Sequence, residues 1–113
     1  MAEKFMDKAN RTWVAIPAPN YIDGQSGQDL LDVALQLLQV GFSRLALDMA
    51  STRAVNSVGI SRLIGIIETL EKKDGKLALC TPNPAIAKTF QIMGLAKKAL
   101  VCRVLQEVKD FTG

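Results

Sequence analysis

The side chains most suggestive of chemistry lie between Asp48 and Ser61, where a short apolar run gives way to a helical pattern. This junction is polar and rich in small residues, and it leads into a helix N-terminus, whose free N–H groups attract anions. In open α/β sheets, binding sites gather where strands lead into helices, at the C-terminal edge of the strands. We therefore predict that the functional site lies at this junction.

The composition disfavours catalysis. The 113 residues include no histidine, which removes the commonest general base and a common metal ligand. Two distant cysteines cannot build a zinc site alone, and no serine has a histidine to activate it. Neither a Walker loop nor a GxGxxG motif is present. We predict no catalytic residue, no cofactor and no metal site.

Charge and hydropathy disfavour nucleic acids and membranes as ligands. The net charge of +3 is mild, the basic residues are dispersed, and only 5% of the chain is aromatic, unlike nucleic-acid binders. No apolar run approaches the roughly 18 residues of a membrane span. The first residues carry Glu3 and Asp7 in place of an apolar signal segment. We therefore expect a cytoplasmic protein without a membrane span, in which Cys80 and Cys102 are buried free thiols.

The first half of the chain predicts a hairpin, a helix and a buried strand. Residues 5–16 suggest two strands around a polar turn at 8–11, followed by a connection rich in Pro and Gly over 17–28. Residues 29–40 have a helical pattern, with Ser26 or Gly27 as the start and Gly41 as the stop. Residues 44–49 are an apolar run that suits a strand buried on both faces.

The second half alternates helices with strands. Residues 57–72 predict a helix whose apolar face includes Ile64, and residues 76–80 predict a strand. Asn83 and Pro84 are typical of the N-cap and first position of a third helix, whose buried face would be Ile86, Phe90 and Met93. Residues 99–104 suggest a last strand, and residues 106–111 a terminal helical turn.

This order of elements predicts an α/β fold. Strands and helices that alternate over residues 44–104 require parallel strands joined by right-handed crossovers. The opening hairpin adds an antiparallel pair at one side. We predict one domain over residues 1–113, with a mixed, mostly parallel sheet of about five strands flanked by about four α-helices. Leu47 and Ile64 are predicted core residues.

The helix over residues 57–72 has one unusual apolar position. With Ile60 at the centre of the buried face, a 100° wheel puts Val58 on the opposite side, near Arg62, Gly65 and Thr69. Single exposed valines are common and need no explanation, so wheel geometry alone favours an incidental valine. The alternative is that Val58 anchors a docking patch together with Ser61.

The order of motifs resembles the STAS domain family, which contains the anti-sigma factor antagonists. Four landmarks follow the family pattern over roughly residues 12–111. They are a strand that ends in Asp, a short segment with Ser and Gly that opens an amphipathic helix, a Gly before the next strand, and a third helix with its ending. The matching stretches are Leu45-Ala46-Leu47-Asp48, Val55-Asn56-Ser57-Val58-Gly59-Ile60, Leu63 with Leu70, Gly75-Lys76-Leu77-Ala78-Leu79, Pro84-Ala85-Ile86-Ala87-Lys88 and Ile92-Met93-Gly94-Leu95.

The resemblance implies a protein-binding regulatory module. Its partner would be a serine-kinase anti-sigma factor or a comparable switch protein, bound through the loop that opens the second helix. In regulated members of the family, phosphorylation of the serine before the glycine releases the partner, since a phosphate adds nearly two charges to a packed contact. The expected partner-binding residues are Asn56, Ser57, Val58, Gly59, Ser61, Arg62, Gly65 and Thr69.

This sequence departs from the family pattern at the phosphorylation site. Val58 stands at the acceptor position, Asn56 stands where the family has Asp, and Ser57 is the one serine of the pair that remains. We expect Ser57 to cap the helix, with a displaced phosphorylation site as the alternative. The usual phosphoserine switch is therefore in doubt, while the docking surface is not.

Other functions remain open from the sequence. A second hypothesis is an accessory subunit of a transporter or a sensory scaffold, a role that relatives of this fold take and that needs no phosphoserine. A third is a small nucleotide- or lipid-binding domain, although the sequence shows no phosphate cradle. An enzyme fits least well. We expect the chain to be a monomer or a weak dimer.

Overall fold

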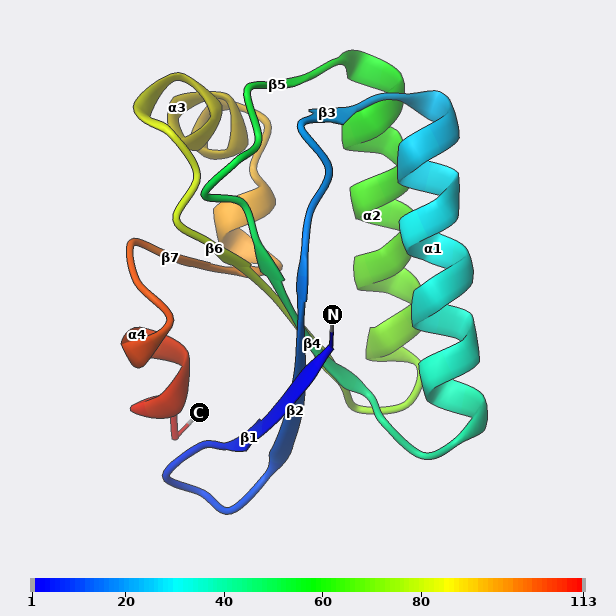
Figure 1. Ribbon diagram of the computed structural model, residues 1–113, viewed down its shortest axis with the longest axis vertical. Helices are drawn as coiled ribbons and strands as arrows, with labels where there is room; N and C mark the ends of the chain where they lie inside the picture. The colour runs from blue at the N-terminus through cyan, green and yellow to red at the C-terminus, as the bar shows by residue number, and fades with distance from the viewer. Residues whose placement is uncertain (1, 113) are drawn as a thin grey trace.

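The structure, a computed structural model that describes residues 2–112, has the mixed α/β architecture that the sequence predicts (Figure 1). The ends of the predicted domain, residues 1 and 113, lie outside the described residues. In chain order, the elements are β1 (Glu3–Met6), β2 (Thr12–Pro17), β3 (Tyr21–Ile22), α1 (Gly24–Gln39), β4 (Arg44–Asp48), β5 (Ala54–Val55), α2 (Ser57–Glu71), β6 (Lys76–Cys80), α3 (Pro84–Ile92), the short 3-10 helix η1 (Leu95–Lys97), β7 (Leu100–Cys102) and α4 (Gln106–Lys109).

Among the described residues, the main sheet has five strands in the order β1-β2-β4-β6-β7. The β1–β2 pair is antiparallel, and every other neighbouring pair is parallel. The predicted hairpin, the parallel strands and the mixed sheet are therefore confirmed. No helix among residues 2–112 is both long enough and apolar enough to cross a membrane.

One face of the sheet is covered by α1 and α2, which lie side by side (Figure 1). The strand pattern Leu-Ala-Leu in β4 and β6 sends its leucines to this face, because successive side chains of a strand point to opposite sides. Leu47 at 0% exposed and Leu79 at 0% join Leu63 and Ile67 of α2 in one core cluster. The prediction that Leu47 is a core residue is confirmed. Ile64 is only partly buried, and Ile66 takes the fully buried position instead.

Helix α1 begins earlier than its apolar pattern predicts. Asp23 is the N-cap, and it forms a capping box with Ser26, whose side chain accepts a hydrogen bond from the N–H of Asp23. The segment over residues 17–28 was predicted to be a connection because of its Pro and Gly content, but it contains β3 and the first turn of α1. The capping box formed by Asp23 and Ser26 stabilises the start of the helix, and this outweighs the low helix propensity of the glycines at positions 24 and 27.

Helix α3 follows the sequence prediction except at one residue. Asn83 is the N-cap, accepting a hydrogen bond from the N–H of Ile86 at 2.9 Å, and Pro84 holds the first helical position. Ile86 and Phe90 are buried, but Met93 is 53% exposed. The prediction for Met93 is wrong because Met93 is the C-cap at the exposed end of α3, where the neighbouring Ile92 is also 72% exposed.

The opposite face of the sheet carries a second, smaller core around Trp13, which is 0% exposed, next to α4. Asp7 accepts hydrogen bonds from Nε1 of Trp13 at 2.8 Å and from Nε of Arg11 at 3.1 Å. Burial by itself raises the pKa of Asp7, but these hydrogen bonds and those from backbone N–H groups outweigh it, so the pKa lies below its ordinary value. The ionised carboxylate fixes Trp13 and the turn of the hairpin. Cys80 and Cys102 are buried and free, as predicted.

Candidate functional site

The start of α2 is held in place by two short strands that the sequence did not predict. Strand β5 pairs in parallel with β3, so Tyr21 lies opposite Ala54 and Ile22 lies opposite Val55. The two-stranded ribbon sits above the main sheet at the beginning of α2 (Figure 1). Strands of only two residues carry no detectable period in a sequence, so only the folded chain reveals them.

Asn56, and not Ser57, caps helix α2. The Oδ1 atom of Asn56 accepts a hydrogen bond from the N–H of Gly59 at 2.8 Å, and the backbone of Asn56 is extended with φ −87° and ψ 176°. The N–H of Asn56 donates to the carbonyl of Ile22 at 3.1 Å. The predicted capping role of Ser57 is therefore wrong, since the ribbon places the N-cap one residue earlier. Ser57 is the first helical residue and is exposed.

Gly59 is buried directly beneath the ribbon. A Cβ atom at this position would lie 2.2 Å from the carbonyl oxygen of Ile22, closer than any real contact of that kind. The absence of a side chain at Gly59 thus lets the first turn of α2 approach the backbone of β3. This close approach determines how far residues 57, 58 and 61 protrude from the protein surface.

Val58 projects from this first turn with 47% of its surface exposed. Asn56, Ser57 and Ser61 are exposed around it. Tyr21, 56% exposed on the neighbouring strand β3, is a residue that the sequence reasoning missed. A lone aromatic side chain in a polar segment was the available signal, because tyrosine is enriched in protein interfaces.

Two of the sequence-predicted site residues, Arg62 and Gly65, face α1, and a third, Thr69, is hydrogen-bonded within α2. Arg62 packs against Gly27 of α1, where a Cβ on the glycine would lie 2.7 Å from that of Arg62. The Nε atom of Arg62 donates to the carbonyl of Gly24 at 3.5 Å. Gly65 lies near Leu31, and the hydroxyl of Thr69 donates to the carbonyl of Gly65 at 2.7 Å.

Arg62, Gly65 and Thr69 are all partly buried, and Arg62 and Gly65 lie in the contact between α1 and α2. The helical wheel had placed them on a solvent face with Val58. That part of the prediction is wrong, because a wheel identifies the residues that share a face but not the helix that covers it. The exposed part of the predicted set is Asn56, Ser57, Val58 and Ser61, which we call the α2 patch.

The loop that leads from β4 to the α2 patch is fixed by polar contacts. Asp48 accepts a hydrogen bond from the N–H of Ala50 at 3.0 Å, and the buried hydroxyl of Thr52 donates to the carbonyl of Pro19 at 2.8 Å. The N–H of Arg53 donates to the carbonyl of Asn20 at 2.7 Å. The side chain of Asn83 reaches the carbonyl of Thr52 at 3.4 Å. A patch carried by such a loop keeps its shape before any partner arrives.

The α2 patch is mixed in polarity. It combines one apolar side chain with three short polar ones at a helix N-terminus, whose dipole is positive. Within the described chain, the first turn of α2 carries no acidic residue, and no group of three or more cysteine and acidic side chains could hold a metal ion.

Comparisons with known proteins agree with this architecture. The family model of the STAS domain matches residues 2–109. A comparison with curated proteins found no match. The crystal structure of TM1081 from Thermotoga maritima is 15% identical, covers 95% of this chain and 90% of its own, and has a TM-score of 0.76.

Two further solved structures are similar. An anti-sigma factor antagonist (STAS) domain protein from Planctomyces limnophilus is 16% identical over 96% of this chain and 94% of its own, with a TM-score of 0.70. SpoIIAA from Bacillus, in its phosphorylated form, is 16% identical over 96% of each chain, with a TM-score of 0.62. At these identities the likeness to solved structures shows a shared fold.

Proposed function

The chain belongs to the STAS domain family, and we propose that it is a regulatory module that binds a protein partner through the α2 patch. The proposed partner is a serine-kinase anti-sigma factor or a comparable switch protein. Among the three solved structures named above, the Planctomyces limnophilus protein is described as an anti-sigma factor antagonist (STAS) domain protein, and SpoIIAA was solved in a phosphorylated form. The family match supports the class of function, and the geometry of α2 supports the place.

The observation that carries the proposal is Val58. It is an apolar side chain, 47% exposed, on a helix start that hydrogen bonds and the close approach at Gly59 hold rigid. Protein interfaces typically have an apolar core surrounded by a polar rim. Val58, with Ser57 and Ser61 around it on the first turns of α2, has that composition, and Tyr21 is a second exposed apolar side chain, on strand β3. Catalysis has no part in the proposal, and the contact is proposed to form in the cytoplasm.

Control by phosphate at the usual family position is excluded from the proposal, because Val58 has no hydroxyl group. Ser57, next to it, is exposed and does not supply the helix cap. Because position 58 has no acceptor, we propose a partner contact that forms without the usual phosphoserine switch, and Ser57 is the alternative acceptor that the next experiment tests.

Incubation with a serine-kinase anti-sigma factor and ATP is expected to leave the mass of the wild-type protein unchanged. The variant Val58→Ser is expected to gain one phosphate, because it places a hydroxyl on the exposed first turn of α2. Intact-mass spectrometry measures both, and Ser57→Ala in the Val58→Ser background confirms which hydroxyl reacts. A phosphate on Ser57 of the wild-type protein would contradict the proposal and show that the switch has moved by one residue.

The variant Val58→Asp is expected to weaken partner binding at least tenfold while leaving the fold intact. A carboxylate in the first turn interacts favourably with the helix dipole by about 0.3–1 kcal/mol, so the melting temperature of the free protein should hold or rise. The same carboxylate desolvated against a partner is unfavourable, and a tenfold loss corresponds to about 1.4 kcal/mol. Calorimetric titration with the anti-sigma factor from the same genome measures the affinity.

A matched control is Val40→Asp. Val40 is 69% exposed at the C-terminal end of α1, which runs parallel to α2, so Val40 lies far from the start of α2 (Figure 1). It receives the same substitution away from the α2 patch, so its affinity should equal that of the wild type. Equal binding by Val58→Asp would place the docking surface elsewhere. Recovery of transport components in place of an anti-sigma factor, when the protein is used as bait, would favour the accessory-subunit hypothesis.

A further inference from the structure

The face of the sheet opposite α1 and α2 contains a hollow that the register of the strands creates. Ala15 of β2 pairs with Ala46 of β4, and Ala46 pairs with Ala78 of β6. Paired residues of neighbouring strands point to the same side, so three methyl groups line up across the sheet, and those of Ala15 and Ala46 line the hollow. Glu3 continues the row on β1, opposite Ala15.

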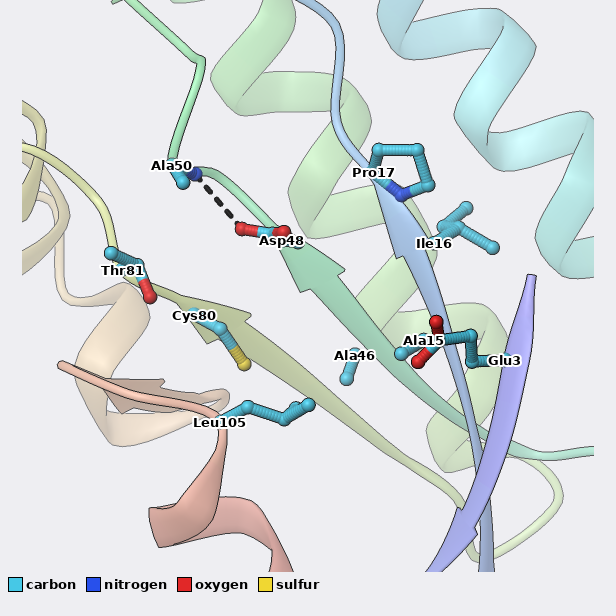
Figure 2. A pocket seen from close by; sticks show the side chains of 10 residues that line it. All are labelled: Glu3, Ala15, Ile16, Pro17, Ala46, Asp48, Ala50, Cys80, Thr81 and Leu105. Atoms are coloured by element: carbon cyan, nitrogen blue, oxygen red, sulfur yellow. Dashed lines mark hydrogen bonds between the residues drawn. The ribbon is translucent and has the colours of Figure 1, made fainter. Parts of the chain in front are cut away.

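The walls of this alanine hollow come from the next row of residues and from the chain before α4. Asp48 lies at the end of β4 and Cys80 at the end of β6, paired in register. Thr81 and Leu105 complete the rim, and the hollow has a volume of about 500 Å³. In Figure 2, Ala46 and Ala15 lie between Asp48 on one side and Glu3 on the other, and the side chain of Glu3 points back toward Ala15.

The alanine hollow combines negative charge at its margins with apolar side chains at its base. Glu3 and Asp48 contribute two carboxylates, and no lysine or arginine is among the described residues that line it. Burial, followed by the nearby Cys102 and Asp48, raises the pKa of Cys80 to about 12, so its thiol stays neutral. The methyl groups of Ala15 and Ala46 offer apolar contact without competing hydrogen bonds. A ligand that fits must carry positive charge at one end and a short apolar body.

We propose that the alanine hollow binds a small organic cation, namely a primary ammonium group on a short aliphatic stem. The ammonium group lies at the carboxylate of Asp48, and the stem lies over Ala46 and Ala15 toward Glu3. One oxygen of Asp48 already accepts the N–H of Ala50 at 3.0 Å, which orients the carboxylate at the rim. This site is separate from the α2 patch and does not depend on the proposed protein partner.

The test is a titration of the full chain with n-butylammonium, followed by amide chemical shifts. Shifts are expected to be largest at Ala15, Ala46, Asp48 and Cys80, with a Kd of about 1 mM, typical of a fragment of this size. Butyrate should cause no comparable shifts because the carboxylates repel it. Butanol, which has the same stem without charge, should bind at least fivefold more weakly.

Two variants test the location of the site, one by removing a charge and one by filling the hollow. Asp48→Asn removes the charge but keeps an oxygen that can accept the Ala50 N–H, and it should weaken butylammonium binding at least fivefold. Ala15→Leu fills the hollow from a half-buried position and should abolish binding. The matched control is Glu71→Gln, which removes one exposed charge at the far end of α2 and should leave the Kd unchanged.

Wild-type spectra that do not change with butylammonium would overturn the proposal. Equal binding of butanol, or an Asp48→Asn variant that binds as tightly as the wild type, would also overturn it. Either result would show that charge does not contribute to the binding of the ligand. Melting curves of each variant verify that the fold is intact. Ala15→Leu provides a second measurement that does not rely on Asp48.

Discussion

The variant Leu47→Ala is expected to lower the free energy of unfolding by about 2–5 kcal/mol, through lost transfer energy and the cavity left behind. Leu47 is 0% exposed on the central strand β4, paired with Ile16 of β2 on one side and Leu79 of β6 on the other. Because strands flank it on both sides and helices cover it, few neighbours can move into the vacated space. Denaturant titration measures the loss as a shift of the midpoint at constant slope.

Two further truncations calibrate that value. Ile92→Ala removes carbon atoms from a side chain that is 72% exposed, so its effect should stay within about 0.5 kcal/mol. Ile64→Ala should fall between the two, because Ile64 is only partly buried against the core. A loss near zero for Leu47→Ala would mean that the leucines of β4 do not form the core.

The variant Gly59→Ala is expected to destabilise the protein by about 1–3 kcal/mol or more, although alanine is intrinsically favoured over glycine in a helix. The added Cβ atom would lie 2.2 Å from the carbonyl oxygen of Ile22 and 2.7 Å from its carbon. Backbone atoms cannot turn aside as a flexible side chain can, so α2 and β3 must separate. Their separation would also stretch the 3.1 Å hydrogen bond from Asn56 to Ile22.

Gly65→Ala is the matched control, since it makes the same substitution in the same helix. The nearest atom to a Cβ at Gly65 is Cδ2 of Leu31 at 3.9 Å, an ordinary contact. Gly65→Ala should therefore stabilise the protein by up to about 1 kcal/mol. Opposite signs for the two variants in thermal and denaturant unfolding are the expected result. A stabilised Gly59→Ala protein would contradict the close packing of α2 against β3.

If α2 does move in Gly59→Ala, the α2 patch moves with it. Partner binding should then fall together with stability, whereas Val58→Asp should change binding alone. The pair of variants thus distinguishes a site damaged by a shifted helix from a site damaged at its surface.

The main elements of the fold could be predicted from the sequence because their signals are local. The Leu-Ala-Leu run that ends at Asp48, and the similar run that ends at Cys80, indicate strands buried on both faces. Asn83 followed by Pro84 marks the start of α3, and the structure confirms both positions. The alternation of these elements then requires parallel strands, as observed. Each of these inferences uses residues that are neighbours in the chain.

The composition of the candidate site was also available from the sequence, but its shape was not. The sequence indicates that Val58 lies opposite the buried Ile60, and the structure shows both positions as expected. It cannot indicate that α1 covers Arg62 and Gly65, because that depends on which face of α2 packs against α1. Nor can it place the N-cap at Asn56, which depends on a hydrogen bond to Ile22 from another strand.

The alanine hollow shows the same division between local pattern and tertiary placement. The sequence determines that Ala46 and Ala78 each lie between two leucines, on the side of their strands away from those leucines. Only the register of the folded sheet places Ala15, Ala46 and Ala78 in one row, with Asp48 and Glu3 at its margins. The physical reason is that period and capping act within a segment, whereas register, helix contact and cavity shape depend on packing between segments distant in the chain.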